Sequence, residues 1–261
     1  MRHQDETLAV YADEVRSDPD VLGLVLVGSL ARGTERADSD VDVYLVLAEA
    51  AFDRARERDR LSYIETDVAT YDGGYVDVKV VSPTYLAAAA QRGDEPTRAS
   101  LVGARVIWSR IADLDAEVER ISRPGPDFFR TRCASFIAQM RLQGGYFLGR
   151  GEKRDDPYLT AWASLHMISA ADRALLSHHG VLFRGHKYLR EMVAGLPELP
   201  ADYGRLVDEQ LRRPTADRGL AIMRSVEEFR DWGVPGDATL SRYIEDTELA
   251  WLFGTLPPEY A

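Results

Sequence analysis

The sequence predicts an α+β protein in two parts, residues 1–123 and residues 124–261. In the first part, short apolar runs such as Val21–Val27 alternate with helical patterns, which is typical of a sheet with attached helices. In the second part, apolar side chains recur only at helical spacing. The stretch Ser122–Asp127, with two prolines and a glycine, interrupts regular structure between them. We therefore expect a domain of strands and helices followed by an all-α helical bundle.

The beginning of the first part predicts a helix, two strands and a second helix. Leu8, Tyr11 and Ala12 lie on one apolar stripe of the first helix, and the turn sequence Asp18-Pro19-Asp20 ends it. The four expected elements span residues 3–17, 21–27, 40–47 and 48–61.

The rest of the first part predicts a hairpin, two helices and a short strand. Asp72-Gly73-Gly74 is a turn sequence between expected strands at 62–71 and 75–81. Pro83 is well placed at the first position of a helix that runs to residue 90. A strand at 105–108 and a helix at 113–121 complete this part.

The second part predicts a bundle of helices. They are expected over residues 129–147, 158–177, 186–194, 202–213, 215–232 and 239–253. The helix at 158–177 is apolar on most faces, so we expect it at the centre. Asp172 lies within it, and an unpaired buried charge is costly. Arg173 or another arginine of the bundle is its expected partner, and a cationic substrate is the alternative.

Two carboxylates share one face of the second predicted strand. Strand side chains alternate, so Asp40 and Asp42 point one way while Val41 and Val43 point the other. Like charges this close repel unless a cation lies between them. Carboxylate oxygens are ligands that Mg²⁺ prefers, together with substrate phosphates. The pair is therefore a candidate Mg²⁺ site.

A Gly-Ser turn precedes this pair along the chain. Gly28 allows the backbone to approach a phosphate closely, and exposed amides at a turn attract anions. The Ser29 hydroxyl adds a further donor. The segment thus predicts a phosphate-binding turn beside a metal-binding pair.

The whole segment, GSLARGTERADSDVDVYLV from Gly28 to Val46, resembles the signature of the DNA polymerase beta-like nucleotidyltransferase superfamily. It is most similar to small bacterial members, including aminoglycoside and lincosamide nucleotidyltransferases with a C-terminal helical domain. The resemblance is strong over about residues 21–81. It implies a mixed sheet with flanking helices in the first domain, and a helical domain that contributes to the substrate cleft. A polar loop before an edge strand is the alternative interpretation.

The resemblance also implies a third carboxylate on a later strand, as a metal ligand or as the base that activates the acceptor. Asp77 occupies that position, with Val76 and Val78 on the opposite face. Glu65 and Asp67 alternate on the neighbouring expected strand and are the rival candidates.

Two basic residues are candidate phosphate contacts. The segment Phe183–Leu189 resembles a stretch in several antibiotic-modifying members where a basic residue reaches the triphosphate, and Lys187 is the matching position. Arg32 lies in the signature itself. A solvent-facing role is the alternative for both side chains. His178, His179 and His186 match no zinc-binding spacing.

The implied reaction moves a nucleoside monophosphate, with AMP the expected one, from a nucleoside triphosphate to a hydroxyl of a small acceptor, and it releases pyrophosphate. Asp40, Asp42 and Asp77 are the expected catalytic and metal-binding residues, with two Mg²⁺ ions and ATP or another triphosphate as co-substrate. Alternatives are transfer to a protein or an RNA end, or a non-catalytic, antitoxin-like nucleotide-binding partner. The acceptor, and whether Asp77 or another carboxylate is the base, stay open.

Charge separates these alternatives. Residues 1–123 carry 15 Lys and Arg against 24 Asp and Glu, a balance of −9, and residues 124–261 carry 17 against 19, a balance of −2. A nucleic-acid partner needs a basic surface, so it is not expected. An acidic domain instead favours a cationic acceptor such as an aminoglycoside-type antibiotic, and the alternative is that the acidic surface only keeps the protein soluble.

The chain has a single cysteine, Cys133, so no internal disulfide is expected, which fits a reducing cytosol. The first residues lack the apolar core of a signal peptide, and no apolar run approaches the ~20 residues of a membrane span. We expect a cytoplasmic monomer or homodimer with no membrane partner.

Overall fold

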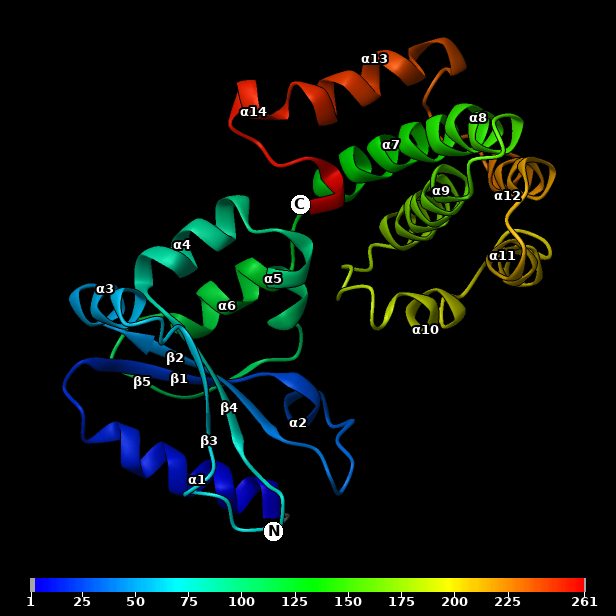
Figure 1. Ribbon diagram of the computed structural model, residues 1–261. Coiled ribbons are helices and arrows are strands. Elements are labelled where there is room, and N and C mark those ends of the chain that lie inside the picture. The colour runs from blue at the N-terminus through cyan, green and yellow to red at the C-terminus, as the bar shows by residue number, and fades with distance from the viewer. Residues whose placement is uncertain (1–2, 261) are drawn as a thin grey trace. The chain divides into compact units, whose positions relative to one another are not determined.

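The computed structural model describes residues 3–260 and divides the chain into two compact units, residues 1–124 and 125–261. The first unit combines strands and helices, and the second is helical (Figure 1). The predicted α+β fold is therefore confirmed. Among residues 3–260, no helix has the length and apolar character needed to cross a membrane.

The first unit is built on a five-stranded mixed sheet in the order β3-β4-β2-β1-β5. Its strands are β1 (Val21–Leu26), β2 (Val41–Leu47), β3 (Ser62–Glu65), β4 (Val76–Val81) and β5 (Arg105–Ser109). Its helices are α1 (His3–Arg16), α2 (Gly28–Arg32), α3 (Glu49–Glu57), α4 (Pro83–Arg92), α5 (Glu95–Ser100) and α6 (Leu114–Ser122). The β2–β4 pair is parallel and the other pairs are antiparallel.

Each face of the sheet has its own apolar core, because side chains alternate along the strands. On one face, residues of β1, β2 and β4 pack against Leu8 and Tyr11 of α1. On the other face, they pack against Leu86 of α4 and Ile121 of α6. Figure 1 shows α1 on one side of the sheet and α4, α5 and α6 on the other. The strands are thereby held on both faces.

The first strand of the predicted hairpin is shorter than expected, since β3 ends at Glu65. Residues 66–75 leave the sheet, and Val68 is buried in the core on the α1 side. The backbone amide of Thr70 donates to Thr7 Oγ1 of α1 at 3.0 Å. The predicted strand over 62–71 is therefore wrong beyond Glu65, and the Thr70 amide finds its partner in Thr7 of α1 instead of in a neighbouring strand.

The second unit is a helical bundle. Its helices are α7 (Pro126–Leu142), the π-helical turn Gln143–Phe147, α8 (Leu148–Lys153), α9 (Pro157–His178), α10 (Leu189–Ala194), α11 (Tyr203–Arg212), α12 (Ala216–Phe229), α13 (Thr239–Tyr243) and α14 (Ala250–Phe253). As predicted, α9 is central, with most of its C-terminal half buried. The helix expected over 239–253 is present but interrupted: α13 continues directly into a π-helical turn at Ile244–Glu248, and a bend at Leu249 separates that turn from α14.

Asp172 of α9 is fully buried and paired. Arg190 Nη1 donates to both carboxylate oxygens at 2.9 and 3.0 Å, and the Tyr203 hydroxyl donates to Oδ1 at 2.7 Å. The partner is thus another arginine of the bundle, as predicted. Arg173 instead lies over the ring of Phe136, at 4.2 Å from its centroid. Burial nevertheless raises the pKa of Asp172, against the opposing effect of Arg190.

Candidate active site

Three carboxylates meet at one edge of the first unit. Asp42 of β2 and Asp77 of β4 are direct partners in the parallel ladder, and Asp40 precedes β2 by one residue. One oxygen from each lies within 4.8 Å of those of the other two. All three side chains are partly buried. We refer to Asp40, Asp42 and Asp77 as the carboxylate triad.

The register of the two central strands produces this meeting. Val41 pairs with Val76 and Val43 with Val78, and these four valines are almost completely buried on the opposite face. A slip of one residue would exchange the buried and exposed faces, so the valines fix the pairing. Asp42 and Asp77 are therefore held side by side by the packing behind them.

Gly28 lies directly against the triad. Its backbone has φ +70°, and a Cβ atom built there would lie 1.8 Å from Asp42 Oδ2. The amide of Val27 donates to the Asp42 carbonyl oxygen at 2.9 Å, which attaches the end of β1 to β2 at this point. Only glycine fits between the turn and the carboxylate, because any side chain would displace Asp42.

Ser29 lies in the first turn of α2, the short helix that Gly28 begins. The first amides of a helix have no acceptor within it, and the residue before α2, Val27, offers no side-chain cap. At the other end, Thr34 N donates to the Ser29 carbonyl oxygen at 3.0 Å, and Gly33 adopts the left-handed conformation that ends the helix. The Gly-Ser turn expected from the sequence is thus the start of a short helix beside Asp42.

The electrostatics of the triad are those of crowded carboxylates. Burial, and then the charge of Asp40, raises the pKa of Asp77. A hydrogen bond to Asp40 raises the pKa of Tyr75 to about 12. Burial and the same carboxylate raise the pKa of Tyr71. Negative charge that raises the pKa of neighbouring acids is the condition under which a divalent cation binds.

A polar pair that the sequence analysis missed occupies the next position along the same two strands. Tyr44 pairs with Lys79 in the ladder, and Lys79 Nζ donates to Tyr44 Oη at 3.3 Å. Tyr44 Oη is also 2.7 Å from Ser100 Oγ. The period of two along the strands is the signal that could have shown it, since it places these side chains on the face of Asp42 and Asp77.

The rival carboxylates lie elsewhere. Glu65 pairs with Val76, so it faces the α1 side of the sheet, opposite to Asp77. Asp67 lies in the exposed loop after β3. Among residues 3–260, the triad is the one group of three or more His, Cys, Asp or Glu side chains close enough to share a metal ion. The three histidines therefore form no such group.

The two candidate basic residues lie in different units. Arg32 ends α2, and its aliphatic stem lies against Gly103, where a Cβ atom would be 3.1 Å from Arg32 Cγ. Lys187 lies in the second unit, in the exposed turn before α10, with Nζ 5.2 Å from the ring centroid of Tyr188. The predicted contact of either side chain with phosphate stays a prediction.

Strands β1 to β4 of the mixed sheet and the carboxylate triad lie in the part of the chain that matches a known family. Residues 8–93, about a third of the chain, match the family model described as "Nucleotidyltransferase domain". This match runs from within α1 to the end of α4 and includes the triad, Gly28 and Ser29. The protein is therefore an enzyme that carries a nucleotidyltransferase domain.

The chain is also similar to a solved structure, a nucleotidyltransferase-like protein from Exiguobacterium sibiricum 255-15. The two are 12% identical with a TM-score of 0.46, and the similarity covers 93% of this chain and 77% of the other. No curated protein sequence matches the chain.

Proposed function

We propose that the enzyme transfers a nucleoside monophosphate, with AMP the expected one, from a Mg²⁺-bound nucleoside triphosphate to a hydroxyl of a small cationic acceptor. The observation that carries this proposal is the carboxylate triad, whose oxygens lie within 4.8 Å of one another. The family match over residues 8–93 supports nucleotidyl transfer as the reaction class.

The donor set of the triad fits Mg²⁺. It consists of carboxylate oxygens alone, and burial together with the charge of Asp40 raises the pKa of Asp77. Asp40, Asp42 and Asp77 would hold the metal together with the phosphates of the substrate. When bound, Mg²⁺ supplies positive charge that neutralises the negative charge developing during phosphoryl transfer.

The chain's own residues then bind the phosphates and accept a proton. Gly28 permits close approach of the backbone, and the amides of the α2 turn with Ser29 Oγ donate to phosphate oxygens. Arg32 and Lys187 are proposed as further phosphate contacts. Asp77 takes the proton of the acceptor hydroxyl as that oxygen bonds to the α-phosphorus. The bond to the bridging oxygen breaks, and pyrophosphate leaves with its electron pair.

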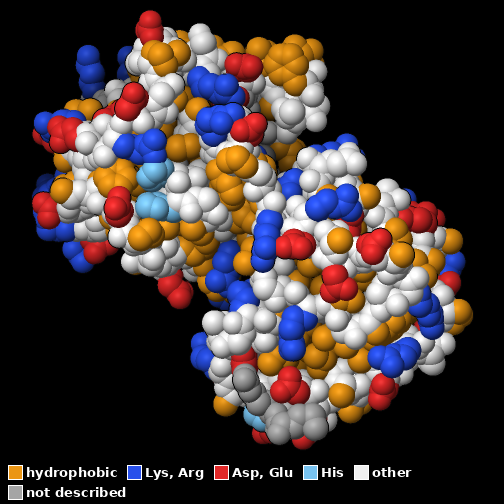
Figure 2. All heavy atoms as spheres, turned by 180° about the vertical axis from the view of Figure 1, so that it is seen from behind, with side chains coloured by type: hydrophobic (Ala, Val, Ile, Leu, Met, Phe, Trp, Pro, Cys, Tyr) orange, Lys and Arg blue, Asp and Glu red, His pale blue; other side chains and the backbone are white. Residues whose placement is uncertain are grey.

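Charge supports the cationic acceptor over a nucleic acid. The first unit has the balance of 15 against 24 charged residues, or −9. On the face drawn in Figure 2, Lys and Arg side chains are interspersed with Asp and Glu over both units. An aminoglycoside-type antibiotic is the proposed class of acceptor. A complete triad favours catalysis over an antitoxin-like binding role.

The test offers labelled ATP, GTP, CTP and UTP with Mg²⁺ to a panel of aminoglycosides, lincosamides and other hydroxylated amines, with tRNA and protein acceptors alongside. Product mass identifies both the nucleotide and the acceptor. Asp42→Asn removes a charged ligand while nearly keeping its shape, so transfer is expected to fall by orders of magnitude in a folded protein. Full activity of Asp42→Asn, or transfer in excess chelator, would contradict the proposal.

A further inference from the structure

Asp40 reaches the triad at the end of an exposed loop. We call residues 33–40, between α2 and β2, the Asp40 loop. Within it, Ser39 N donates to the Arg36 carbonyl oxygen at 3.1 Å, and Arg36 N donates to Ser39 Oγ at 2.9 Å. The ion pair between Arg36 and Asp38 is largely exposed. These local contacts fold the loop, but contacts from outside it must fix its position on the sheet.

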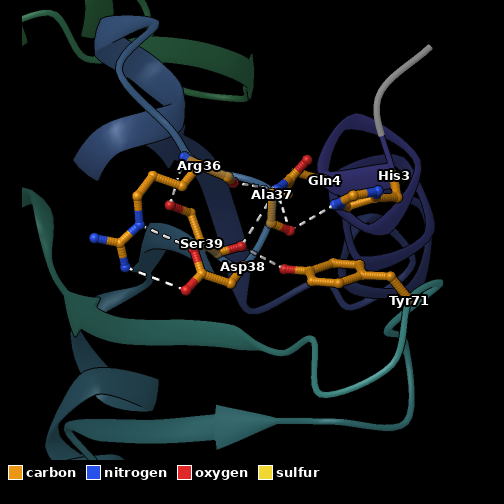
Figure 3. A network of polar contacts seen from close by, with 7 residues as sticks. All are labelled: His3, Gln4, Arg36, Ala37, Asp38, Ser39 and Tyr71. Carbon is orange, nitrogen blue, oxygen red and sulfur yellow. Dashed lines mark hydrogen bonds and ion pairs between the residues drawn. The ribbon is translucent and has the colours of Figure 1, made fainter.

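Gln4, in the first turn of α1, supplies such contacts. Its side chain is 2% exposed, and Nε2 lies 2.9 Å from the carbonyl oxygen of Arg36, 3.3 Å from that of Ala37 and 3.5 Å from that of Ser39. Figure 3 shows the amide pointing into the concave side of the loop. The three carbonyl oxygens share the two N–H donors of this one amide group. The loop is therefore curved around the Gln4 side chain.

Tyr71 and His3 support the same loop from the side. The Tyr71 hydroxyl donates to the Ser39 carbonyl oxygen at 2.6 Å, and His3 Nε2 lies 2.9 Å from the Ala37 carbonyl oxygen. The rings of His3 and Tyr71 pack at 4.3 Å between centroids (Figure 3). The Ser39 carbonyl belongs to the peptide group that leads into Asp40, so its two donors set the orientation of that peptide group.

The strand side of Asp40 is fixed as well. Val41 N donates to the Tyr75 carbonyl oxygen at 3.1 Å, which begins the pairing of β2 with β4. Asp40 therefore stands between a ladder hydrogen bond on one side and the peptide held by Gln4 and Tyr71 on the other. Its backbone is held on both sides although the loop itself is exposed.

We propose that Gln4 is a positioning residue, which holds the Asp40 loop so that Asp40 completes the metal-binding triad. The metal-binding part of this inference rests on the proposed function, whereas the hydrogen bonds to the loop do not depend on it. A residue that served stability alone would leave the metal affinity of the folded protein unchanged. A positioning residue changes that affinity, because partners outside the ligand set orient the ligands.

The test compares Gln4→Leu with Gln91→Leu, the same substitution at an exposed glutamine of α4. Mn²⁺ binding is followed by electron paramagnetic resonance without nucleotide, and amide hydrogen exchange is followed without metal. We expect the dissociation constant for Mn²⁺ to rise about tenfold in Gln4→Leu and to stay at the wild-type value in Gln91→Leu. Exchange should quicken at residues 36–41 and stay slow in β2 from Val43 onward.

Two results would overturn the inference: wild-type Mn²⁺ affinity in folded Gln4→Leu, or unchanged exchange in the Asp40 loop. If Gln4→Leu does not fold, Tyr71→Phe decides instead, since it removes only the phenolic donor to Ser39 and should weaken Mn²⁺ binding a few-fold. Wild-type protein that binds Mn²⁺ no better than Asp40→Asn would contradict the proposed metal site. The exchange of the loop would still show whether Gln4 holds it.

Discussion

The candidate site depends on the missing side chain of Gly28 as much as on the carboxylates beside it. The turn that carries Ser29 comes so close to Asp42 that a Cβ atom would lie 1.8 Å from Oδ2. The sequence predicted a close backbone approach here, but toward a phosphate. Which neighbour needs the space depends on the pairing of β1 with β2, so the residue pattern alone could not show it.

Gly33 offers a matched control for Gly28. Both have a left-handed backbone, at φ +70° and +69°, but a Cβ atom at Gly33 would meet nothing within 4 Å. Each alanine variant should lose about 1 kcal/mol of stability for the left-handed conformation. Only Gly28→Ala should also displace Asp42 and weaken Mn²⁺ binding, by about tenfold or more. Thermal unfolding and Mn²⁺ titration measure the two effects, and equal Mn²⁺ affinity in both variants would refute the role of the contact.

Asp77 has a role separable from nucleotide binding if it accepts the acceptor proton. Asp77→Asn should keep Mg²⁺-nucleotide affinity within a few-fold and slow transfer by ~10²–10⁴-fold, the usual contribution of a general base. Glu65→Gln and Asp67→Asn should transfer normally, because Glu65 faces the other side of the sheet and Asp67 lies in a loop. Single-turnover kinetics separates binding from transfer. Slow transfer in either control with normal transfer in Asp77→Asn would place the base elsewhere.

At the scale of elements, the strands that carry the triad were predictable and their neighbours less so. Buried valines alternating with aspartates define β2 and β4 in the sequence itself. The end of β3 is not defined in this way, because no turn sequence occurs before Asp72, whereas the chain already leaves the sheet after Glu65 and contacts Thr7 of α1. The pairing of β2 with β4 is likewise a long-range choice. Sequence periodicity gives the face of Asp77 but not the strand beside it.

The hydrogen bonds from Gln4 that hold the Asp40 loop could not be predicted from the sequence pattern either. Gln4 lies one turn before Leu8 on the buried stripe of α1, so the helical period indicates its burial. The period does not indicate its hydrogen-bond partners, because they belong to a loop that begins more than twenty residues further along the chain. Asp172 differs from Gln4 in this respect, since a charged residue inside an apolar helix indicates that a partner of opposite charge is present. Its partner Arg190 could be named by type although not by number.

The link between α9 and α10 through this pair gives a pH-dependent prediction. Arg190→Met should destabilise the protein by ~3 kcal/mol near neutral pH, because it leaves a buried carboxylate without its cation. Burial already raises the pKa of Asp172, and Arg190 opposes that rise. The folded state thus binds more protons than the unfolded state above the ordinary carboxyl pKa, so stability falls as pH rises there. Without Arg190, the folded-state pKa of Asp172 rises further, so the pH range over which stability falls extends to higher pH.

The destabilisation by Arg190→Met should therefore be smallest below the ordinary carboxyl pKa of about 3.9, where Asp172 is protonated in the folded and the unfolded state, and should grow toward pH 8. Urea unfolding at several pH values measures it. The double variant Arg190→Met with Asp172→Asn should recover most of the loss at neutral pH, because no buried charge remains. A loss that is the same at every pH would contradict the assignment of the effect to the Asp172 carboxylate.

At the scale of the whole molecule, charge is divided unequally between two units that each have their own core. The first unit, which carries the triad, has 15 basic against 24 acidic residues, or −9, and the second has 17 against 19, or −2. Composition predicted this division without any structure. The sheet adds that three of the acidic residues converge at one point, where their repulsion is concentrated.

The negative charge of the first unit gives a prediction about the acceptor. A cationic acceptor is attracted toward an acidic unit, and salt weakens that attraction, since the Debye length falls from about 10 Å at 0.1 M to about 3 Å at 1 M ionic strength. The KM of an aminoglycoside should therefore rise several-fold between these conditions, while kcat at saturation changes little. A neutral hydroxylated acceptor, with Mg²⁺-nucleotide held saturating, is the control and should show no such rise. Because ionic strength acts on the nucleotide as well, only the difference between the two acceptors measures steering. An aminoglycoside KM that stays constant, or one that moves in parallel with that of the neutral acceptor, would mean that the acidic balance of the first unit plays no part in choosing the acceptor.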